Sequence, residues 1–476
     1  MSRHIGIALF FVFFFCALSP TLAIGPRKEP ARTIYISSST GNDDNPGTMQ
    51  APRRTIASLT KEERSGSTIL LRRGDTFFEG IRNFSDCRIG AYSSGYAPLL
   101  CGFRILVKPK AWKKVKNLKN VWEIDLRTDK NFIGVDKSRE WGEGTLYNIG
   151  CIYRPDADAI FGQMVAAPDS LLRDGQFFVS SVFRRADVKP DTFSTLYLRS
   201  KKNPKDYGTL CFSTYLLGID NATYCIIQDI NVMGFATHGA GGDLTGTHIT
   251  HCGFDVIGGA VQLTFATRAR FGNGVEAWST GMRDMLVDYC TFSRTYDCAT
   301  TIQASGPDAA TAVNIKFLNN KMTHCRQAFE FFLFGKPGLS FQDCEFSGNI
   351  AYMMGDNGFS CPEPRDADFL SWGPTSPPIP VRNNLLFGAS YFYTENLNPL
   401  MGFNTVYIYP SQYLVEYPYR RDTPIPASDP SLYRRRSPRD NSVFTIVTPG
   451  SEQDISLRRQ FEDSIGWKAP RLPVGR

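Results

Sequence analysis

Five short segments of this chain repeat one spacing, and this repeat restricts the fold more strongly than any other sequence feature. Each segment ends in an apolar anchor that stands two residues after a small polar one. The anchors are Ile230, Phe254, Phe292, Met322 and Phe346, at intervals of roughly 24 to 38 residues. Such periods, with short apolar alternations between Gly, Asn and Asp turns, predict a solenoid of stacked coils instead of several separate domains.

Two kinds of solenoid have periods of this length. A leucine-rich repeat requires a denser Leu and Asn pattern than this chain has, whereas β-branched, aromatic and Gly-rich coils of about two dozen residues favour a parallel β-helix. In a β-helix, equivalent residues of successive coils stack about 4.8 Å apart. The predicted stacks are Phe254, Phe292, Met322 and Phe346 in the interior, and Cys252, Cys290, Asn320 and Cys344 at a turn.

The cysteine content agrees better with packing than with a disulfide framework. The chain has 12 cysteines, and setting aside Cys16 in the N-terminal apolar run leaves an odd number. They form no CxxC pair and the five histidines show no ligand spacing, so no zinc site is expected. A disulfide between neighbouring coils is the alternative, although parallel neighbours present poor disulfide geometry. No cofactor is expected; Asp43 and Asp44 are candidate calcium ligands, but turn hydrogen bonds are the favoured role for them.

Several stretches resemble exported right-handed parallel β-helix proteins of the pectate-lyase-like, carbohydrate-active group. These stretches are residues 33–56, 67–77, 88–102 and 270–278, the last with the sequence R-F-G-N-G-V-E-A-W. The resemblance implies an all-β fold, a right-handed parallel β-helix solenoid with an inserted β-rich subdomain and an irregular C-terminal tail. The expected boundaries are coils over residues 24–102 and 211–410, the insertion over 103–210, and a C-terminal extension over 411–476.

Within the C-terminal part of the chain, three features are predicted. One last coil lies near residues 383–387, and the arginine run that starts at Arg434 is expected to be a solvated tail. A short helix is expected from Ser451, whose hydroxyl would cap it.

Residues 1–23 have the pattern of a signal peptide. Arg3 precedes an unbroken apolar run from Ile5 to Leu18, and the small residue Ala23 follows. The run is too short for a transmembrane helix, and no later segment is long enough to span a bilayer. We therefore expect a secreted or periplasmic protein with no membrane span. A retained N-terminal anchor is the alternative.

The charge of the chain gives little information about partners. Its 53 basic and 46 acidic residues leave a net charge of +7 without a basic stripe, so nucleic acid is not expected to bind. The expected partner is a polysaccharide or an oligosaccharide. The sequence does not indicate an oligomeric state.

An acidic column is the strongest candidate for catalysis. We count positions from each anchor and treat the extra residues of the longest coil as a loop around residues 260–271. This count places His238, Glu276, Thr300 and Glu330 in one column to within a residue. Both glutamates stand between apolar residues, which a strand turns inward, so the carboxylates point outward. Two coil spacings separate them by about 9 to 10 Å. That value is at the upper edge of the range for inverting glycosidases, roughly 6.5 to 9.5 Å.

Other residues near this column complete the predicted site. Asp297 on the intervening coil adds a third carboxyl group. A catalytic pair that includes Asp297 would have a shorter distance between its carboxyl groups, which is compatible with retention of the anomeric configuration. Clustered carboxyls can supply one acid and one base, so we assign acid/base roles to Glu276, Asp297 and Glu330. The candidate substrate-binding residues are Asn273, Trp278, Gln303, Arg268, Arg270, His238, His324 and Arg326.

Three functions fit these residues. The carboxyl cluster favours an exported polysaccharide-degrading glycoside hydrolase. A lyase acting on uronic-acid-containing glycans is the second, with His238, His324, Arg326 or Lys321 removing the C5 proton while a cation neutralises the uronate. The third is a non-catalytic glycan-binding or surface protein, because this fold serves all three purposes.

Overall fold

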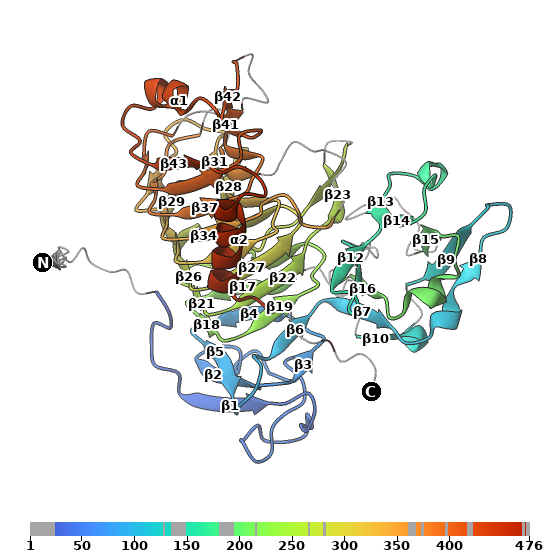
Figure 1. Ribbon diagram of the computed structural model, residues 1–476. Coiled ribbons are helices and arrows are strands. Elements are labelled where there is room, and N and C mark those ends of the chain that lie inside the picture. Colours follow the sequence, from blue (N-terminus) through green and yellow to red (C-terminus); the bar gives the residue numbers. More distant parts are fainter. Residues whose placement is uncertain are drawn as a thin grey trace, which may run out of the picture.

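The protein forms a right-handed parallel β-helix, in which three long sheets run side by side along one axis (Figure 1). The structure, a computed structural model, describes residues 24–126, 129–134, 149–179, 195–214, 217–264, 267–278, 282–359, 368–372, 376–395, 398–416, 422–468 and 472. The predicted signal peptide lies outside these ranges. The sheets confirm the predicted fold class.

Successive coils add neighbouring strands to three sheets, here named A, B and C. In spatial order, sheet A contains β1 (Arg32–Ile36), β2 (Ser67–Arg72), β5 (Arg88–Tyr92), β18 (Ile226–Gln228), β21 (His248–Thr250), β26 (Arg283–Asp288), β29 (Ala312–Leu318), β33 (Glu345–Ser347), β36 (Val381–Arg382) and β39 (Met401–Gly402), with β32 (Phe341–Gln342) beside β29. Sheet B contains β4 (Ile81–Ser85), β17 (Leu217–Thr223), β20 (His238–Gly241), β25 (Val275–Trp278), β28 (Cys298–Ala304), β31 (Gln327–Leu333), β35 (Asp368–Trp372), β38 (Tyr391–Glu395), β41 (Tyr413–Glu416) and β42 (Ile425–Pro426). Sheet C contains β3 (Thr76–Phe77), β6 (Leu99–Cys101), β19 (Asn231–Met233), β22 (Gly253–Ile257), β27 (Thr291–Thr295), β30 (Lys321–Thr323), β34 (Ile350–Tyr352), β37 (Leu385–Phe387), β40 (Thr405–Ile408) and β43 (Val443–Ile446).

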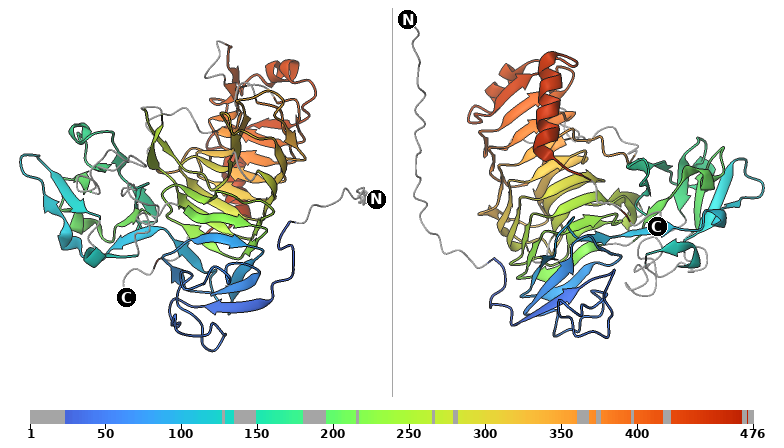
Figure 2. Two further views of the ribbon diagram at one scale, coloured as in Figure 1. Left: turned by 180° about the vertical axis from the view of Figure 1, so that it is seen from behind. Right: turned by 60° about the horizontal axis from the view of Figure 1, so that its bottom comes forward.

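A separate β-rich unit stands beside the β-helix (Figure 2). Its first sheet contains β10 (Phe132–Ile133), β7 (Phe103–Leu106), β16 (Cys211–Ser213), β11 (Ile152–Arg154) and β12 (Ala159–Phe161). Its second sheet contains β13 (Gln163–Met164), β14 (Gln176–Val179), β15 (Thr195–Arg199), β9 (Val121–Asp125) and β8 (Lys113–Lys114). Short 3-10 helices occupy Pro109–Ala111, Asp129–Asn131, Pro168–Ser170 and Pro204–Tyr207. The unit has its own apolar core, which includes Trp112, Phe177 and Leu196.

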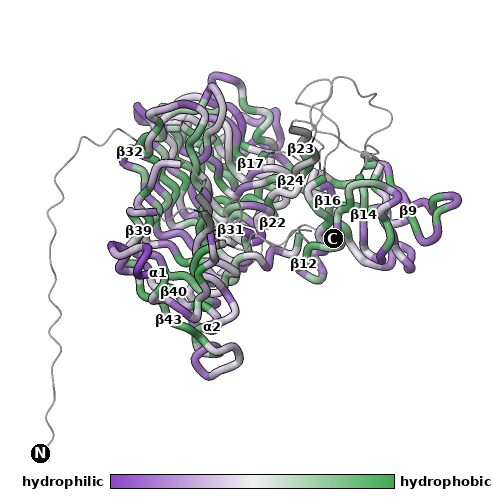
Figure 3. The backbone as a smooth tube through the Cα atoms, turned by 90° about the horizontal axis from the view of Figure 1, so that it is seen from above, coloured by the Kyte–Doolittle hydropathy of each residue, from purple (hydrophilic) through white to green (hydrophobic). Residues whose placement is uncertain are grey.

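The core of the β-helix is a column of apolar side chains from the three sheets, and apolar and polar residues alternate along the coils (Figure 3). Phe254 and Phe292 are fully buried and stack with their ring centroids 4.9 Å apart. The register continues this stack through Met322 to Ala351 in sheet C. The predicted interior stack is therefore correct for Phe254, Phe292 and Met322.

The first and fifth predicted anchors are wrong. Phe346 pairs with Phe317 in sheet A, and Val232 takes the place in the stack that the spacing predicts for Ile230. Cys344 is likewise absent from the turn stack, because it precedes β33 of sheet A. Sheets A and C alternate inward and outward residues in the same way, so local spacing does not distinguish between them.

After Cys252 and Cys290, the turn stack continues through asparagines instead of further cysteines. Asn349 Oδ1 accepts a hydrogen bond of 2.8 Å from the Asn320 backbone N–H, and Asn384 Oδ1 accepts one of 2.9 Å from that of Asn349. Asn404 and Ser442 extend the series. All four asparagine side chains are buried, so this ladder satisfies backbone groups at a turn that water does not reach.

The described cysteines are free and buried, as expected for packing residues. Cys252 and Cys290 occupy neighbouring turns of one stack, because each directly precedes one of the paired residues Gly253 and Thr291. No disulfide joins them. Cys16 and Cys361 lie outside the described residues.

Two helices follow the last coils. Ser451 accepts a hydrogen bond from the Asp454 N–H at the start of α2 (Glu452–Ile465), which confirms the predicted capped helix. This helix lies along the stacked strands of sheet C (Figure 2), with Phe461 packed on Tyr352 and Phe387.

The chain beyond residue 410 differs from the expected extension. β43 pairs with β40, so the coils continue past the predicted last coil. Residues 434–436 belong to α1 (Pro430–Arg436), where Arg434 is half-buried and donates hydrogen bonds to the carbonyls of Asp440 and Ser442. Arg435, Arg436 and Arg439 are exposed, as predicted for a solvated run. In the described residues, no helix has the length and apolar character that a bilayer crossing requires.

A conservative core substitution tests the packing of the coils. Ile249 is fully buried in β21, and Ile249→Val removes one methylene from the interior. We expect the free energy of unfolding in urea to fall by about 1 kcal/mol. Ile455→Val on α2, where the side chain is 54% exposed, is the matched control and should change it by less than about 0.5 kcal/mol. Equal effects of the two substitutions would contradict the assignment of Ile249 to the core.

Candidate functional site

The outer face of sheet B, from β25 to β31, carries a column of polar side chains. The register pairs Glu276 with Thr301 and Thr301 with Glu330, so the two glutamates occupy one column, as the spacing predicts. The middle residue is Thr301 instead of Thr300. His238 lies three residues before this column, because the anchor of its coil is Val232 and not Ile230.

Asn273 holds Glu276 in place, and His238 supports Asn273. The Asn273 amide donates a hydrogen bond of 2.6 Å to Glu276 Oε2, and its own oxygen accepts one from the Cys298 N–H. The Asn273 backbone N–H donates to His238 Nδ1 at 3.1 Å, which places the ring proton on Nε2. The 3.5 Å approach of His238 Nδ1 to Glu276 is therefore not a hydrogen bond. Since Asn273 is only 2% exposed, it orients Glu276 instead of binding substrate.

Glu330 is held by donors from the neighbouring strand. The Gln303 amide donates a hydrogen bond to Glu330 Oε2, and the Cys298 thiol lies 3.6 Å from the same oxygen. The thiol also lies 3.1 Å from Gln327 Oε1. Burial, together with the nearby carboxylates of Glu330 and Asp297, raises the pKa of Cys298 well above its ordinary value, so the thiol keeps its proton and donates it. Because Gln303 is 7% exposed, its predicted role in substrate binding becomes one of orienting Glu330.

Three residues of this face are absent from the predicted site: Cys298, Thr301 and Gln327. Thr301 is fully buried between the two glutamates, and its hydroxyl makes no hydrogen bond within the described part of the chain. The alternation of the strands could have found Thr301, which shares the column of the glutamates. Cys298 and Gln327 lie three residues before Thr301 and Glu330, where alternation predicts an inward side chain, so it does not indicate them.

Asp297 lies beside the column and not within it. It precedes β28, with Oδ1 3.7 Å from the Cys298 sulfur. Arg326 forms an ion pair of 3.8 Å with Asp297 and lies over the ring of Tyr296 at 6.0 Å. Asp297 is thus close to Glu330 through Cys298, but Arg326 compensates its charge.

Arg270, predicted to bind substrate, instead fixes the insertion to the β-helix. Its guanidinium donates to the carbonyls of Gly259 at 2.7 Å and Gly150 at 2.9 Å, and lies over the Tyr296 ring at 4.5 Å. Arg268 belongs to β24 (Thr267–Phe271), which forms a hairpin with β23 (Ala260–Thr264), but its side chain lies outside the described residues.

An aromatic patch borders the acidic column. Trp278 is 39% exposed and meets Phe332 edge to face, with ring centroids 6.3 Å apart. Phe332 stacks on Phe334, which is 38% exposed. Exposed rings beside polar groups suit the aliphatic face of a sugar ring. Of the predicted binding residues, Trp278 has the exposure that contact with a substrate requires.

Asp43 makes turn hydrogen bonds. Its carboxylate accepts from the backbone N–H groups of Arg54 and Thr55 and from the Thr55 hydroxyl, at 2.8 to 2.9 Å. These hydrogen bonds lower the pKa of Asp43 despite its desolvation, which acts to raise it.

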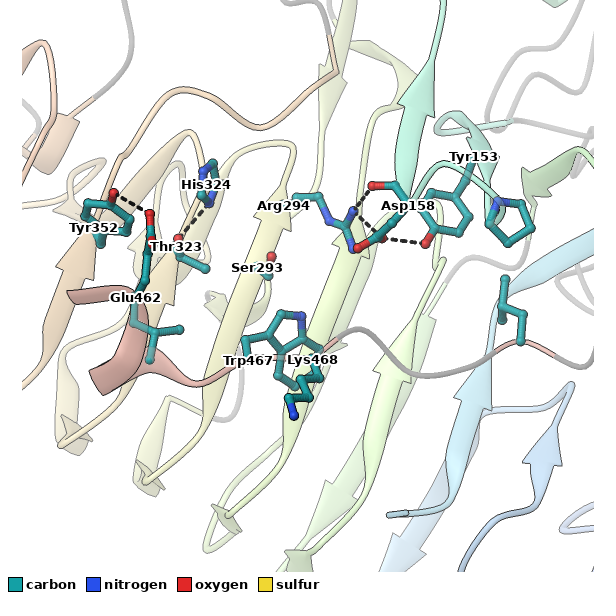
Figure 4. Close-up of a pocket in the computed structure, with 13 residues that line it drawn as sticks. Tyr153, Asp158, Ser293, Arg294, Thr323, His324, Tyr352, Glu462, Trp467 and Lys468 are labelled. Carbon is teal, nitrogen blue, oxygen red and sulfur yellow. Dashed lines mark hydrogen bonds and ion pairs between the residues drawn. The ribbon is translucent and has the colours of Figure 1, made fainter. Parts of the chain in front are cut away.

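His324, also predicted to bind substrate, lies on a different face of the molecule. It follows β30 of sheet C and lines a cavity of about 930 Å³ between α2 and the inserted unit (Figure 4). Among the described residues, none of the acidic column lines this cavity. We place the candidate catalytic site at the column, because two oriented carboxylates share it, whereas the cavity is better described by its binding chemistry.

Comparison with known proteins yields structural neighbours only. No protein-family model and no curated protein sequence matches the chain. XylC in complex with xylose has a TM-score of 0.42 and 12% identity, over 81% of this chain and 64% of XylC. A glycoside hydrolase has a TM-score of 0.41 and 11% identity, over 91% of this chain and 100% of the other. The GH136 lacto-N-biosidase from Eubacterium ramulus has a TM-score of 0.38 and 13% identity, over 81% of this chain and 57% of the other. The chain thus spans less than two thirds of XylC and of the lacto-N-biosidase, and similarity at this level assigns no activity to it.

Proposed function

We propose that the protein is an exported glycoside hydrolase that cleaves a polysaccharide or oligosaccharide on the outer face of sheet B. The observation that carries the proposal is the pair of outward carboxylates, Glu276 and Glu330, on alternate strands of one column beside Trp278. One carboxyl would protonate the leaving oxygen while the other activates the attacking water.

The strand spacing favours inversion at the anomeric carbon. Two strand spacings place the backbones of Glu276 and Glu330 about 9 to 10 Å apart. Inverting enzymes separate their carboxyl groups by roughly 6.5 to 9.5 Å, because a water molecule must fit between the base and the sugar. Side chains that lean toward each other over Thr301 would bring the pair into this range.

The arginines near the column favour a neutral glycan over a uronic-acid polymer. Arg270 is engaged with two backbone carbonyls and Arg326 with Asp297. A lyase needs a cationic group to neutralise the uronate carboxylate. In the described part of the site, these two guanidinium groups are already bound to carbonyl and carboxylate groups of the protein. Elimination is therefore the weaker alternative.

A polysaccharide panel tests the proposed reaction. The purified protein is incubated with plant, algal and host polysaccharides while reducing ends and the absorbance of unsaturated uronates are followed together. We expect reducing ends without a rise in absorbance. A parallel rise in absorbance would establish elimination instead. No change in reducing ends or absorbance with any polysaccharide of the panel would support a protein that only binds glycans.

A further inference from the structure

The cavity on sheet C is a second place where the fold brings together chemistry for a ligand. Its floor is formed by Ser293 and Arg294 of β27, by Thr323 of β30 and by His324, which follows β30. One side is formed by the inserted unit and the other by the end of α2 and the segment that follows it, with Trp467 across from Arg294 (Figure 4). A volume of about 930 Å³ is within the usual range for small-molecule sites.

We propose that this cavity binds an uncharged sugar residue of a glycan, as a site separate from the acidic column. The proposal goes beyond the proposed hydrolysis and does not depend on it. It rests on two properties of the lining, which are its charges and its mixture of hydrogen-bonding groups and rings.

The guanidinium of the cavity floor is already compensated within the described chain. The Arg294 guanidinium donates to both carboxylate oxygens of Asp255, which is fully buried, and to Asp158 of the inserted unit at 2.7 Å. Burial opposes its charge, but these two carboxylates raise the pKa of Arg294 above its ordinary value. The pKa of His324 is lowered, chiefly by burial, so its ring is neutral near pH 7. An anionic ligand would find little compensation on this floor.

The wall beside α2 carries one charge of each sign. Lys468 and Glu462 both line the cavity, so the wall adds no net charge to a floor on which one guanidinium meets two carboxylates. The resulting excess of one carboxylate favours a ligand without charge over an anion.

The remaining groups match hydroxyl groups and a carbon face. Glu462 accepts a hydrogen bond from the Tyr352 hydroxyl at 3.2 Å, and its carboxylate can accept more from a ligand. His324 Nδ1 shares a hydrogen bond of 2.7 Å with Thr323 Oγ1, so Nε2 is the ring atom available to a ligand. The rings of Tyr352 and Trp467 add apolar surface. Sugars require this combination of donors, acceptors and rings.

Trp467 supplies a ring of fixed position to the lining. Its Nε1 is buried and makes no hydrogen bond in the described chain. The six-membered edge of the indole lies against Gly253, where an added Cβ would come within 2.4 Å of it. The ring is thereby fixed, and the edge that carries the nitrogen faces the strand of Ser293 in Figure 4. Because Nε1 is out of reach of a ligand, Trp467 contributes the apolar surface of its ring to the cavity and not a hydrogen bond.

Saturation-transfer NMR with defined probes tests this assignment. The probes are the methyl glycosides of glucose, galactose, mannose, xylose and N-acetylglucosamine, with glucuronic and galacturonic acids as charged comparators. We expect at least one neutral probe to bind, and Trp467→Ala to reduce its affinity at least fivefold. Trp278→Ala is the matched control at the other face, and it and Glu276→Gln should leave this affinity unchanged.

Glu462→Gln provides a second variant whose surface position spares the fold, and it should weaken the same probe at least threefold. Absence of binding by every neutral probe, tighter binding of the uronic acids, or unchanged affinity in both Trp467→Ala and Glu462→Gln would overturn the proposal. Loss of hydrolysis in Glu276→Gln with binding retained here would separate this site from the catalytic one.

Discussion

Glu330→Gln and Glu276→Gln are each expected to lower kcat on the best glycan substrate by about 10²- to 10⁴-fold, the usual contribution of a positioned acid or base. Both carboxylates are only partly exposed and are oriented by amide donors, so the Gln variants keep their size and most of their contacts. The measurement is the initial rate of reducing-end release at saturating substrate. KM should change much less than kcat, because the lost interaction belongs to the transition state.

Glu345→Gln is the matched control for this prediction. Glu345 lies on the outer face of sheet A, in an ion pair of 3.8 Å with Arg382, far from the column in the register. Its replacement should leave kcat within about twofold of the wild-type value. Full activity of both Glu276→Gln and Glu330→Gln, with unchanged melting temperatures, would remove these residues from the chemistry.

Asn349→Ala is expected to cause the largest loss of stability among single substitutions in the coils. The Asn349 side chain is fully buried, accepts from the Asn320 N–H at 2.8 Å and donates to the Phe317 carbonyl at 3.0 Å and to Asn384 Oδ1 at 3.1 Å. Its removal leaves up to two buried groups, the Asn320 N–H and the Phe317 carbonyl, without this partner, at about 1 to 3 kcal/mol each; Asn384 Oδ1 keeps its hydrogen bond from the Asn349 N–H. We expect the free energy of unfolding in urea to fall by about 2 to 6 kcal/mol.

Ser442→Ala at the end of the same ladder gives a graded comparison. The Ser442 hydroxyl accepts from the Asn404 backbone and side chain and donates to Asp440. The Asn404 amide keeps the Val381 carbonyl and Asp440 keeps the Ser442 N–H, so Ser442→Ala leaves one buried group, the Asn404 N–H, without a partner and should destabilise the protein less than Asn349→Ala. A loss below about 0.5 kcal/mol for Asn349→Ala, the size of an ordinary surface substitution, would show that water or relaxation of the turn replaces the ladder.

The sequence was sufficient for the β-helix and for the shared column of Glu276 and Glu330. The period identifies stacked coils, and the strict alternation of a strand decides which side chains face outward once a coil is aligned. It was insufficient for Phe346 and Ile230, because the same short motif occurs at two different corners of a coil. Aligning on buried asparagines such as Asn320 would have corrected the register.

The roles of the basic residues depended on contacts that no local pattern contains. Arg270 meets the carbonyl of Gly150 across 120 residues of sequence, and Arg294 meets Asp158 across 136. The cavity on sheet C has the same origin, since it requires the inserted unit and the end of α2 to meet beside β27. Contacts between residues so far apart in the sequence exist only in the assembled fold, so no single segment predicts them.

The most direct test of the catalytic assignment is the anomeric configuration of the first product, followed by proton NMR during hydrolysis of the best substrate in the panel. The spacing of Glu276 and Glu330 over two strands predicts that the inverted anomer forms first and then mutarotates. Initial formation of the retained anomer would contradict this pair and would indicate a closer carboxyl pair, and an unsaturated product would contradict hydrolysis itself.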